Sequence, residues 1–381
     1  MKKIKILSII GTRPEAIKMA PVIMELNKHS SYIEQKICIT AQHRHMLDQV
    51  LKLFEIKPDY DLDIMTNNQT LSSIASMILQ RVHPILVAEK PNYLLLQGDT
   101  TSAMSSCLAA FHYGIPVAHV EAGLRTYNNS QPFPEEANRR IISVISSLNF
   151  APTRRAKSNL ISEGVDPKAI LITGNTVIDS LFYILRILGH KKDEFSSLAR
   201  DKRIILVTSH RRENIGVPLR NICIAIKFLA DKYRDSIHFI IPVHPNPNVR
   251  SIIYKSLANI ANISLTDPLD YYSFINVMRH SFLILSDSGG IQEEAPSLAK
   301  PVIVLRDTTE RTEAIEAGAI KLVGTNPKRI IETTELLLND EKEYLSMSRA
   351  TNPFGDGKAS KRIVQFLLGK PVIDFNTKKN K

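Results

Sequence analysis

The sequence predicts an α/β fold with two domains, each built on a parallel β-sheet covered by helices on both faces. Along the 381 residues, short β-rich apolar runs alternate with polar loops containing Gly or Pro and with helix-period stretches. This alternation is typical of parallel sheets with helical crossovers. The length suits two domains of about 150 residues each. A composition of 44% hydrophobic and 23% charged residues excludes a disordered, collagen-like or coiled-coil protein.

The first series of elements opens with the apolar run Ile4–Ile10 and the loop Gly11–Glu15. The helix that follows begins near Pro14, whose missing N–H costs nothing in a first turn, and Glu15 complements the helix dipole. A helix after Thr70 places apolar residues on one face. Further strands are predicted at Ile37–Thr40, Tyr93–Leu96, Val117–Val120 and Leu148–Ala151.

A second series follows the charged stretch 189–202. We place the domain boundary near Gly174, which gives a first domain of residues 1–174 and a second of residues 175–358. The helix from Thr176 then connects the two or begins the second. The second set of predicted strands is Ile204–Thr208, Phe239–Val243, Ile263–Leu265, Phe282–Leu285, Val302–Leu305 and Lys321–Val323.

Charge and cysteine content narrow the class of protein. The net charge is +11, but the basic residues are scattered and no aromatic platform for nucleic-acid bases accompanies them, so a small polyanionic ligand suits the excess as well. Three Cys without a CxxC pair fit a reducing compartment. The apolar start is too short for a signal peptide, and Gly114 and Pro116 interrupt the uncharged run Thr100–Val120. We therefore expect a cytoplasmic globular protein with no membrane segment.

The loops after the predicted strands are unusually rich in ionisable residues. Ligands of parallel sheets bind beyond the carboxyl ends of the strands, so these loops are the candidate site, in a cleft between the two domains. In the first half the loops are Gly11–Glu15, Ala41–Arg44, Gly98–Thr101 and Glu121–Arg125; in the second they are Ser209–Asn214, His244–Pro247, Asp287–Gly290 and Asp307–Arg311.

The loop Ser288-Gly289-Gly290 opens a helix and suits a phosphate, because glycines let backbone N–H groups approach an anion. The competing interpretation is a plain helix N-cap by Ser288. Glu293 and Glu294, one turn later, favour the phosphate site, since a carboxylate there can accept hydrogen bonds from ribose hydroxyls. Neither GxGxxG nor a Walker A sequence occurs. The nucleotide is therefore expected to be part of the substrate, with no cofactor.

Cations and acids are the other candidate groups. Each cation alone is also compatible with a surface charge, but their positions beyond strand ends favour a diphosphate site. Two of the acids also have a structural interpretation. Asp99 could simply cap a helix, and Glu135 could form an ordinary i,i+4 ion pair with Arg139. The cations are Arg13, Lys18, His210, Arg211 and Arg311, and the acids are Asp99, Glu121 and Glu135.

Metal ligation is not predicted. His43 and His45, and the acidic run Asp59–Asp63, have ligand-like spacing without a matching third ligand. We interpret both as solvated loops.

Taken together, the motifs resemble those of the non-hydrolysing UDP-N-acetylglucosamine 2-epimerases from end to end. Many long motifs in the correct order make this resemblance specific. The matching segments are Gly11–Lys18, Gln97–Thr101, His119–Arg125, Pro134–Arg139, His210–Asn214, Asp287–Ala295 and Arg306–Arg311.

The resemblance implies the GT-B architecture, two Rossmann-like domains around a cleft, with a C-terminal helix at about residues 359–368 packing back onto the first domain. It also implies a homodimer that interconverts UDP-GlcNAc and UDP-ManNAc for bacterial surface polysaccharide synthesis. In the family, anti elimination of UDP gives 2-acetamidoglucal, and UDP then adds back to the opposite C2 configuration.

By motif, the resemblance also implies roles for individual residues. Asp99, Glu121 and Glu135 would be the acid/base groups, with Arg139 setting the position and ionisation of Glu135. His210 would contact the departing diphosphate. Phosphate and ribose would contact Ser288, Gly289, Gly290 and Glu294, with Arg13, Lys18 and Arg311 as further substrate-binding cations and Phe274 against uracil.

Alternatives remain open at this level. They are a 2-epimerase of a related UDP-sugar (a diacetamido-uronic acid or a deoxy sugar), a GT-B UDP-sugar glycosyltransferase, a hydrolysing epimerase and a non-catalytic nucleotide-sugar sensor. The doubled acidic motifs speak against the transferase, and the intact acids speak against the sensor.

Three positions depart from the family pattern. Thr312 stands where the family usually has Pro, which indicates a change of loop stiffness. His45 and Asn68 replace the Gln and Arg that are typical of members activated by their own substrate.

We therefore expect no standard allosteric activation. With UDP-ManNAc as the only substrate, the reverse reaction should begin without a lag, because no activator site has to be filled first. Progress curves with and without added UDP-GlcNAc test this; a strict requirement for UDP-GlcNAc would contradict it.

Overall fold

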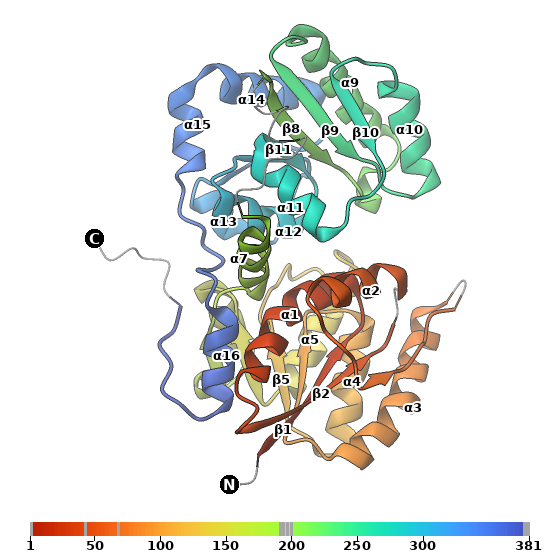
Figure 1. Ribbon diagram of the computed structural model, residues 1–381, viewed down its shortest axis with the longest axis vertical. Helices are drawn as coiled ribbons and strands as arrows, with labels where there is room; N and C mark the ends of the chain where they lie inside the picture. Colours follow the sequence, from red (N-terminus) through yellow and green to blue (C-terminus); the bar gives the residue numbers. More distant parts are fainter. Residues whose placement is uncertain are drawn as a thin grey trace. The chain divides into compact units, whose positions relative to one another are not determined.

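The computed structural model describes residues 3–41, 44–66, 69–189, 195, 198 and 201–375. The chain divides into unit 1, Met1–Tyr183 with Phe354–Lys381, and unit 2, Ile184–Pro353 (Figure 1). The first division lies within helix α7 (Thr176–Leu188) rather than at Gly174. The beginning of α7 belongs to unit 1 because Ser180 donates a hydrogen bond to the Ile17 carbonyl and Tyr183 stacks on Phe54.

Unit 1 contains a seven-stranded parallel sheet in the order β3-β2-β1-β4-β5-β6-β7. Its strands are β1 (Ile4–Ile10), β2 (Ile33–Ile39), β3 (Tyr60–Asp61), β4 (Tyr93–Gln97), β5 (Val117–Val120), β6 (Leu148–Ala151) and β7 (Ile170–Ile172). Its helices are α1 (Arg13–Asn27), α2 (Arg44–Leu53), α3 (Leu71–Glu89), α4 (Thr101–His112), α5 (Glu135–Ile145), α6 (Arg154–Ser162), the 3₁₀ turn η1 (Pro167–Ala169), the first part of α7, and α16 (Ala359–Leu367).

Helix α16 returns from the end of the chain to unit 1, where it lies beside α1 (Figure 1). Its buried residues include Ile363 and Val364, and Phe366 makes an edge contact with Phe150 of β6. Asp179 of α7 accepts hydrogen bonds from the backbone N–H groups of Ala359 and Ser360, which fixes the start of α16. The expected C-terminal helix at 359–368 corresponds to α16.

Unit 2 contains a six-stranded parallel sheet in the order β10-β9-β8-β11-β12-β13. Its strands are β8 (Arg203–Thr208), β9 (Ile237–Pro242), β10 (Ile263–Thr266), β11 (Ser281–Ser286), β12 (Val302–Val304) and β13 (Ile320–Leu322). The helices, with the 3₁₀ turns η, are η2 (Arg212–Asn214), α9 (Val217–Lys232), α10 (Pro247–Leu257), α11 (Tyr271–His280), α12 (Gly289–Glu294), η3 (Ala295–Leu298), α13 (Thr312–Glu316), α14 (Pro327–Asn339) and α15 (Glu341–Ser348).

Both sheets are buried on both faces, as the continuous apolar runs predict. In β8, neighbouring residues Ile204, Ile205 and Leu206 are all buried although their side chains point alternately to opposite faces. Ile205 belongs to the core cluster that Ile222 and Ile226 of α9 complete. The predicted fold class, two α/β units on parallel sheets, is confirmed.

The predicted strands are found, three of them with the predicted ends and the others with ends shifted by one to four residues, and two further strands appear. Tyr60 and Asp61, interpreted above as part of a solvated loop, form β3, which pairs with Cys38 and Ile39 at the sheet edge. This prediction was wrong because a two-residue edge strand has no periodicity to detect. The three residues of β7 escaped for the same reason.

One described helix, α3, is long and apolar enough to cross a membrane by length and composition. Its residues Ile74, Ile78 and Val82 are part of the hydrophobic core of unit 1. The uncharged segment Thr100–Val120 forms α4, a turn and β5, as predicted.

Candidate active site

Each sheet has a switch point where the strand order reverses, and ligands of such sheets bind beside it. In unit 1 the switch point lies between β1 and β4, and in unit 2 between β8 and β11. The loops that leave these four strands, with the helices that follow them, carry Arg13, Lys18 (both in α1) and Asp99 in unit 1, and His210 and Ser288–Gly290 in unit 2. The structure therefore places most predicted site residues where the topology expects a ligand.

In unit 1, the buried carboxylate of Glu15 joins the two loops at the switch point. It accepts hydrogen bonds from the backbone N–H groups of Gly11 at 2.8 Å and Thr12 at 2.5 Å, and from the Thr100 hydroxyl at 2.6 Å. A Cβ on Gly11 would lie 2.5 Å from Cβ of Ser102, so only glycine allows this approach. Glu15 thus holds the start of α1 against the Asp99–Thr100 turn.

Burial raises the pKa of Glu15 from 4.5 to about 7, although the hydrogen bonds from Thr100, Gly11 and Thr12 oppose the shift. The sequence assigned Glu15 only a dipole role. A carboxylate three residues after an N-cap Thr was the signal for a capping box, and the structure shows the half of it in which Glu15 accepts the Thr12 backbone N–H.

Glu121 follows β5 and is surrounded by donors. Its carboxylate contacts the Lys18 ammonium and accepts hydrogen bonds from Gln97 Nε2 at 3.1 Å and Asn175 Nδ2 at 2.6 Å. Its backbone adopts φ of 66°, an uncommon conformation for a residue other than glycine. The ammonium and the two side-chain amides hold this carboxylate in a fixed position.

Asp99, Arg139 and Glu136 form a second cluster of charged side chains. Arg139 Nε donates to Asp99 Oδ2 at 2.7 Å, and its Nη1 donates to Oε2 of the buried Glu136 at 2.9 Å. Glu136 also accepts the backbone N–H groups of Thr126 and Tyr127, both at 3.0 Å. Arg139 thus ties α5 to the loop after β4. Sequence reasoning missed Glu136, which i,i+3 spacing to Arg139 could have indicated.

Glu135 begins α5, directly after Pro134. Its Oε2 is buried, with no hydrogen-bond partner among the described residues. Arg139 contacts the carboxylates of Asp99 and Glu136, and its control of Glu135 stays a prediction. An oxygen of this kind can exchange a proton with a bound molecule.

His119 of β5 forms a hydrogen bond with the backbone just before Asp99. Its Nε2 lies 2.7 Å from the Gly98 carbonyl oxygen, which can only accept, so Nε2 carries the hydrogen. Burial lowers the pKa of His119 to about 4, so the ring is neutral.

In unit 2, Asp287 follows β11 and is fully buried. Its carboxylate accepts hydrogen bonds from the Ser209 hydroxyl, from the backbone N–H groups of His210 and Arg211, and from Asn214 Nδ2, at 2.8 to 3.2 Å. Nδ1 of His210 lies 3.2 Å from Asp287 Oδ1. Asp287 was in a matched motif but had no predicted role.

Arg311 is held by two carboxylates. It contacts Glu293 Oε1, with Nε at 3.0 Å, and Glu310 Oε1. Burial alone would raise the pKa of Glu310, but Arg311 and Arg306 offset it and hold that pKa well below its usual range. The guanidinium also covers Gly289, because a Cβ there would lie 2.9 Å from Arg311 Cζ. Arg311 therefore braces the glycine pair.

The remaining unit 2 residues surround the same loop. Glu294 Oε1 accepts a hydrogen bond from Tyr271 at 2.5 Å. Ser288 makes no side-chain cap hydrogen bond to α12, so the N-cap interpretation of its hydroxyl fails. Phe274 lies on α11, half-buried. Thr312 is the first residue of α13, a position where a helix tolerates Pro, which accounts for the family's usual residue.

No group of three or more His, Cys, Asp or Glu side chains that could hold a metal ion occurs in the part of the chain that the structure describes. His43 and Asn68 lie outside the described residues, as does the side chain of His45.

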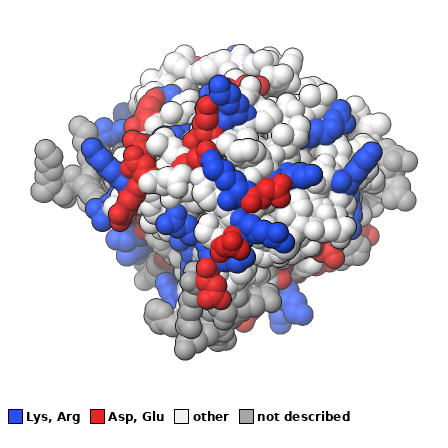
Figure 2. Space-filling model, turned by 90° about the horizontal axis from the view of Figure 1, so that it is seen from above, with Lys and Arg blue, Asp and Glu red and all other residues white. Residues whose placement is uncertain are grey.

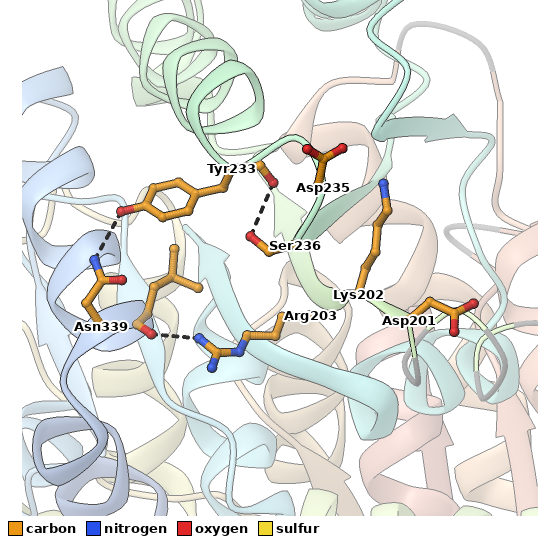
Figure 3. Close-up of a pocket in the computed structure, with 8 residues that line it drawn as sticks. Asp201, Lys202, Arg203, Tyr233, Asp235, Ser236 and Asn339 are labelled. Atoms are coloured by element: carbon orange, nitrogen blue, oxygen red, sulfur yellow. Dashed lines mark hydrogen bonds between the residues drawn. The ribbon is translucent and has the colours of Figure 1, made fainter.

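A cavity of about 420 Å³ in unit 2 lies away from these residues (Figure 3). Two residues of its lining place it at the amino edge of the sheet: Arg203 is the first residue of β8, and Ser236 directly precedes β9. Its polar groups bind one another: Arg203 donates to the Leu338 carbonyl at 2.6 Å and Asn339 to the Tyr233 hydroxyl at 3.0 Å (Figure 3). It is not the candidate site, because ligands of parallel sheets bind at the carboxyl edge.

Charges on the face in Figure 2 alternate in sign. Lys and Arg side chains are interspersed there with Asp and Glu. This face therefore lacks the uniform basic field that binds a phosphate backbone.

Two Rossmann-type sheets with ionisable loops at both switch points are the arrangement of α/β enzymes that act on nucleotide-linked molecules. Comparison with known proteins makes the assignment specific. The family described as UDP-N-acetylglucosamine 2-epimerase matches residues 24–368. The chain belongs to this family and is an isomerase with a GT-B-like fold.

Individual relatives are similar over their whole length. The chain is 50% identical to the UDP-N-acetylglucosamine 2-epimerase of Escherichia coli K12, over 95% of this chain and 98% of the relative. A crystal structure of the Neisseria meningitidis UDP-GlcNAc 2-epimerase bound to UDP-GlcNAc is 51% identical, with a TM-score of 0.90 over 96% of this chain and 100% of that one. The Staphylococcus aureus MnaA structure with UDP is 47% identical, with a TM-score of 0.91 over 98% and 100%.

The raised pKa of Glu15 gives a test of its buried position. A carboxyl whose pKa is higher in the folded than in the unfolded chain stabilises the folded protein. This contribution is fully present below the unfolded pKa of 4.5 and is lost as the pH rises through the folded pKa of about 7. Glu15→Gln cannot titrate. Between pH 5 and 8 the wild type should therefore lose on the order of 3 kcal/mol relative to this variant, measured by urea unfolding.

Glu163→Gln is the matched control. The hydrogen bonds from Arg125 lower the pKa of Glu163, so its contribution is lost only in acid. The stability difference for this control should stay nearly constant from pH 6 to 8. Parallel pH profiles for wild type and Glu15→Gln would show that Glu15 does not titrate in this range.

Proposed function

We propose that this protein catalyses the reversible C2 epimerisation of UDP-GlcNAc to UDP-ManNAc. The observation that carries the proposal is the set of side chains that lie at the switch points of the two sheets. Carboxylates cluster at the carboxyl edge of the unit 1 sheet, and cations and glycines gather at that of unit 2. The E. coli relative, 50% identical, is a UDP-N-acetylglucosamine 2-epimerase. The N. meningitidis relative binds UDP-GlcNAc, which supports the same substrate here.

The chemistry requires both sets of groups. The C2 proton of a pyranoside is not acidic, because no carbonyl stands beside it. Departure of UDP from C1 builds oxocarbenium character, which makes C2–H removable and gives 2-acetamidoglucal by anti elimination. UDP then adds back to give the opposite configuration at C2. The cycle is redox-neutral and needs no cofactor.

Unit 2 is proposed to hold the UDP. Backbone N–H groups at Ser288–Gly290 would bind phosphate, braced by Arg311 over Gly289. His210 would face the departing diphosphate, whose growing charge these donors stabilise. Glu294, oriented by Tyr271, would accept the ribose hydroxyls, and Phe274 would lie against uracil.

Unit 1 is proposed to supply the acid and base groups. Glu121 is an ion-paired carboxylate, and Glu135 has a buried oxygen free to exchange a proton. Asp99, fixed by Arg139, is the third. Arg13 and Lys18 would add positive charge near the substrate. Two carboxylates in different surroundings suit opposite roles in proton transfer.

The direct test is incubation of the protein with UDP-GlcNAc alone in D2O. The expected products are UDP-ManNAc and UDP-GlcNAc carrying deuterium at C2, with an ¹⁸O label in the C1–O bond moving into the non-bridging positions. Glu121→Gln, Glu135→Gln and Asp99→Asn should each lower kcat by about 10²–10⁴-fold, the range for an acid or base group. Glu335→Gln, a carboxylate bound to Lys232 on the surface, is the control and should keep full activity.

The alternatives give distinct outcomes in this assay. Turnover only with an added acceptor would indicate a glycosyltransferase, and free ManNAc would indicate a hydrolysing epimerase. Reaction only with another UDP-sugar would indicate a related epimerase. Inversion without movement of the ¹⁸O label would contradict elimination of UDP.

We also propose a cytoplasmic location and a role in supplying ManNAc-type sugars for bacterial surface polysaccharide. The buried, unpaired thiols of Cys38, Cys107 and Cys223 suit a reducing compartment. No nucleic-acid or membrane partner is proposed.

We propose further that the protein is a homodimer, paired through an α4–α5 patch formed by Phe111, Tyr113, Ile141 and Val144. Val144 is 87% exposed and Phe111 59%, on two helices that pack side by side. Large apolar side chains exposed on neighbouring helices favour a partner. A second copy is the occupant that the family resemblance implies.

Sedimentation equilibrium of Val144→Asp tests this patch. The wild type should be dimeric and the variant shifted towards monomer, because a buried unpaired carboxylate is costly. Val217→Asp, an exposed position on α9, is the control and should remain dimeric. A monomeric wild type, or an unchanged Val144→Asp dimer, would contradict the proposal.

A further inference from the structure

The two oxygens of the Asp287 carboxylate do different work. Oδ2 accepts hydrogen bonds from Ser209 Oγ at 2.9 Å, from the backbone N–H groups of His210 and Arg211 at 3.0 and 3.1 Å, and from Asn214 Nδ2 at 2.8 Å. Oδ1 is directed at His210, whose backbone N–H and Nδ1 both lie 3.2 Å away. One oxygen therefore fixes the loop after β8, and the other faces the imidazole.

The contact at Oδ1 sets the hydrogen on the His210 ring. A carboxylate only accepts, so this 3.2 Å contact favours a hydrogen on Nδ1, the ring nitrogen that faces it. The His210 side chain is 40% exposed, which leaves the other side of the ring accessible to a ligand. When the ring is cationic, Nδ1–H faces Asp287 Oδ1 as an ion pair and Nε2–H is available to an anion.

The same carboxylate places His210 relative to the glycine loop. Asp287 directly precedes Ser288–Gly290, and Ser286 Oγ binds both the Thr208 hydroxyl at 2.7 Å and the Ser288 N–H at 2.9 Å. Asn214, which binds Asp287, also donates to the Leu305 carbonyl after β12 at 3.1 Å. Hydrogen bonds around Asp287 therefore connect the loops that follow β8, β11 and β12.

Charges around His210 show why this support matters. Partial burial lowers the pKa of His210, Asp287 opposes that change, and Arg211, His244 and Arg306 add to it. The His244 ring stacks at 6.1 Å. Three of these four neighbours disfavour a positive imidazole, so Asp287 is the group that favours it.

We propose that Asp287 is a positioning residue that orients His210 and keeps it cationic against the diphosphate that leaves and returns. The inference rests on the proposed function for the identity of the anion. Asp287 itself, buried behind the loop, does not touch the substrate. His210 keeps its protons throughout and lends charge and one hydrogen bond as the C1–O bond breaks.

The variant Asp287→Asn distinguishes the roles of the two carboxylate oxygens. Because four donors point at Oδ2, the amide oxygen should occupy that position and the NH2 should face His210 Nδ1 as a donor. The ring is then expected to be neutral, with its hydrogen on Nε2. In ¹⁵N spectra of the UDP complex at pH 7, wild-type His210 should show two protonated nitrogens, and Asp287→Asn one. We expect kcat/KM to fall by about 10²-fold or more, as when a histidine loses its orienting carboxylate.

Two further variants show whether Asp287 acts through His210. Ser209→Ala removes one donor to Oδ2 and should leave His210 cationic in the UDP complex. In a His210→Asn background, Asp287→Asn should reduce kcat/KM by less than about threefold more, because groups that act as a unit are not additive. An equal loss in both backgrounds would overturn the proposal, as would a wild-type His210 with an unprotonated Nδ1.

The outcomes remain decisive if Asp287→Asn fails to fold, because the wild-type spectrum alone reports the proton on Nδ1. They are also independent of turnover. If the wild type converts no UDP-sugar, the proposed function fails, while the His210 spectrum still decides the role of Asp287.

Discussion

A buried carboxylate at the switch point of each sheet is the interaction on which the rest of the structure depends. Glu15 joins the loops after β1 and β4, and Asp287 joins those after β8 and β11. Loops at the carboxyl edge of a parallel sheet have left the ladder, so their N–H groups need other partners. A carboxylate satisfies several at once, and those donors in turn offset its own burial. The ionisable side chains on these loops are thereby held in fixed positions.

Among the described residues, two buried arginines of the candidate site are each paired with two carboxylates. Arg139 lies between Asp99 and Glu136, and Arg311 contacts Glu293 and Glu310. Removing the Arg139 guanidinium would leave the buried carboxylate of Glu136 without its cation, which costs about 3–5 kcal/mol. Such networks suit the proposed departure of a charged diphosphate. Donors fixed in advance need no rearrangement when the charge develops.

The sequence predicted most of the fold because long apolar runs in parallel strands are unambiguous. Ile4–Ile10, Val117–Val120 and Leu148–Ala151 form strands with the predicted ends. The two- and three-residue strands β3 and β7 were missed, since their pairing comes from neighbours and not from their own pattern. The domain boundary differs because packing of Tyr183 on Phe54 assigns the start of α7 to unit 1.

For the site, residue types and loop positions were determined by the sequence alone: acids after unit 1 strands, cations and glycines after unit 2 strands, and motifs specific to one family. The partners of those groups were decided only by the tertiary structure. Spacing suggested Glu135 for Arg139, and folding in addition brings Arg139 to Asp99, 40 residues away. Asn175 reaches Glu121, and Asp287 reaches His210, through crossovers of 54 and 77 residues. Local periodicity carries no information about such pairs, because strand order, not sequence distance, sets which loops meet.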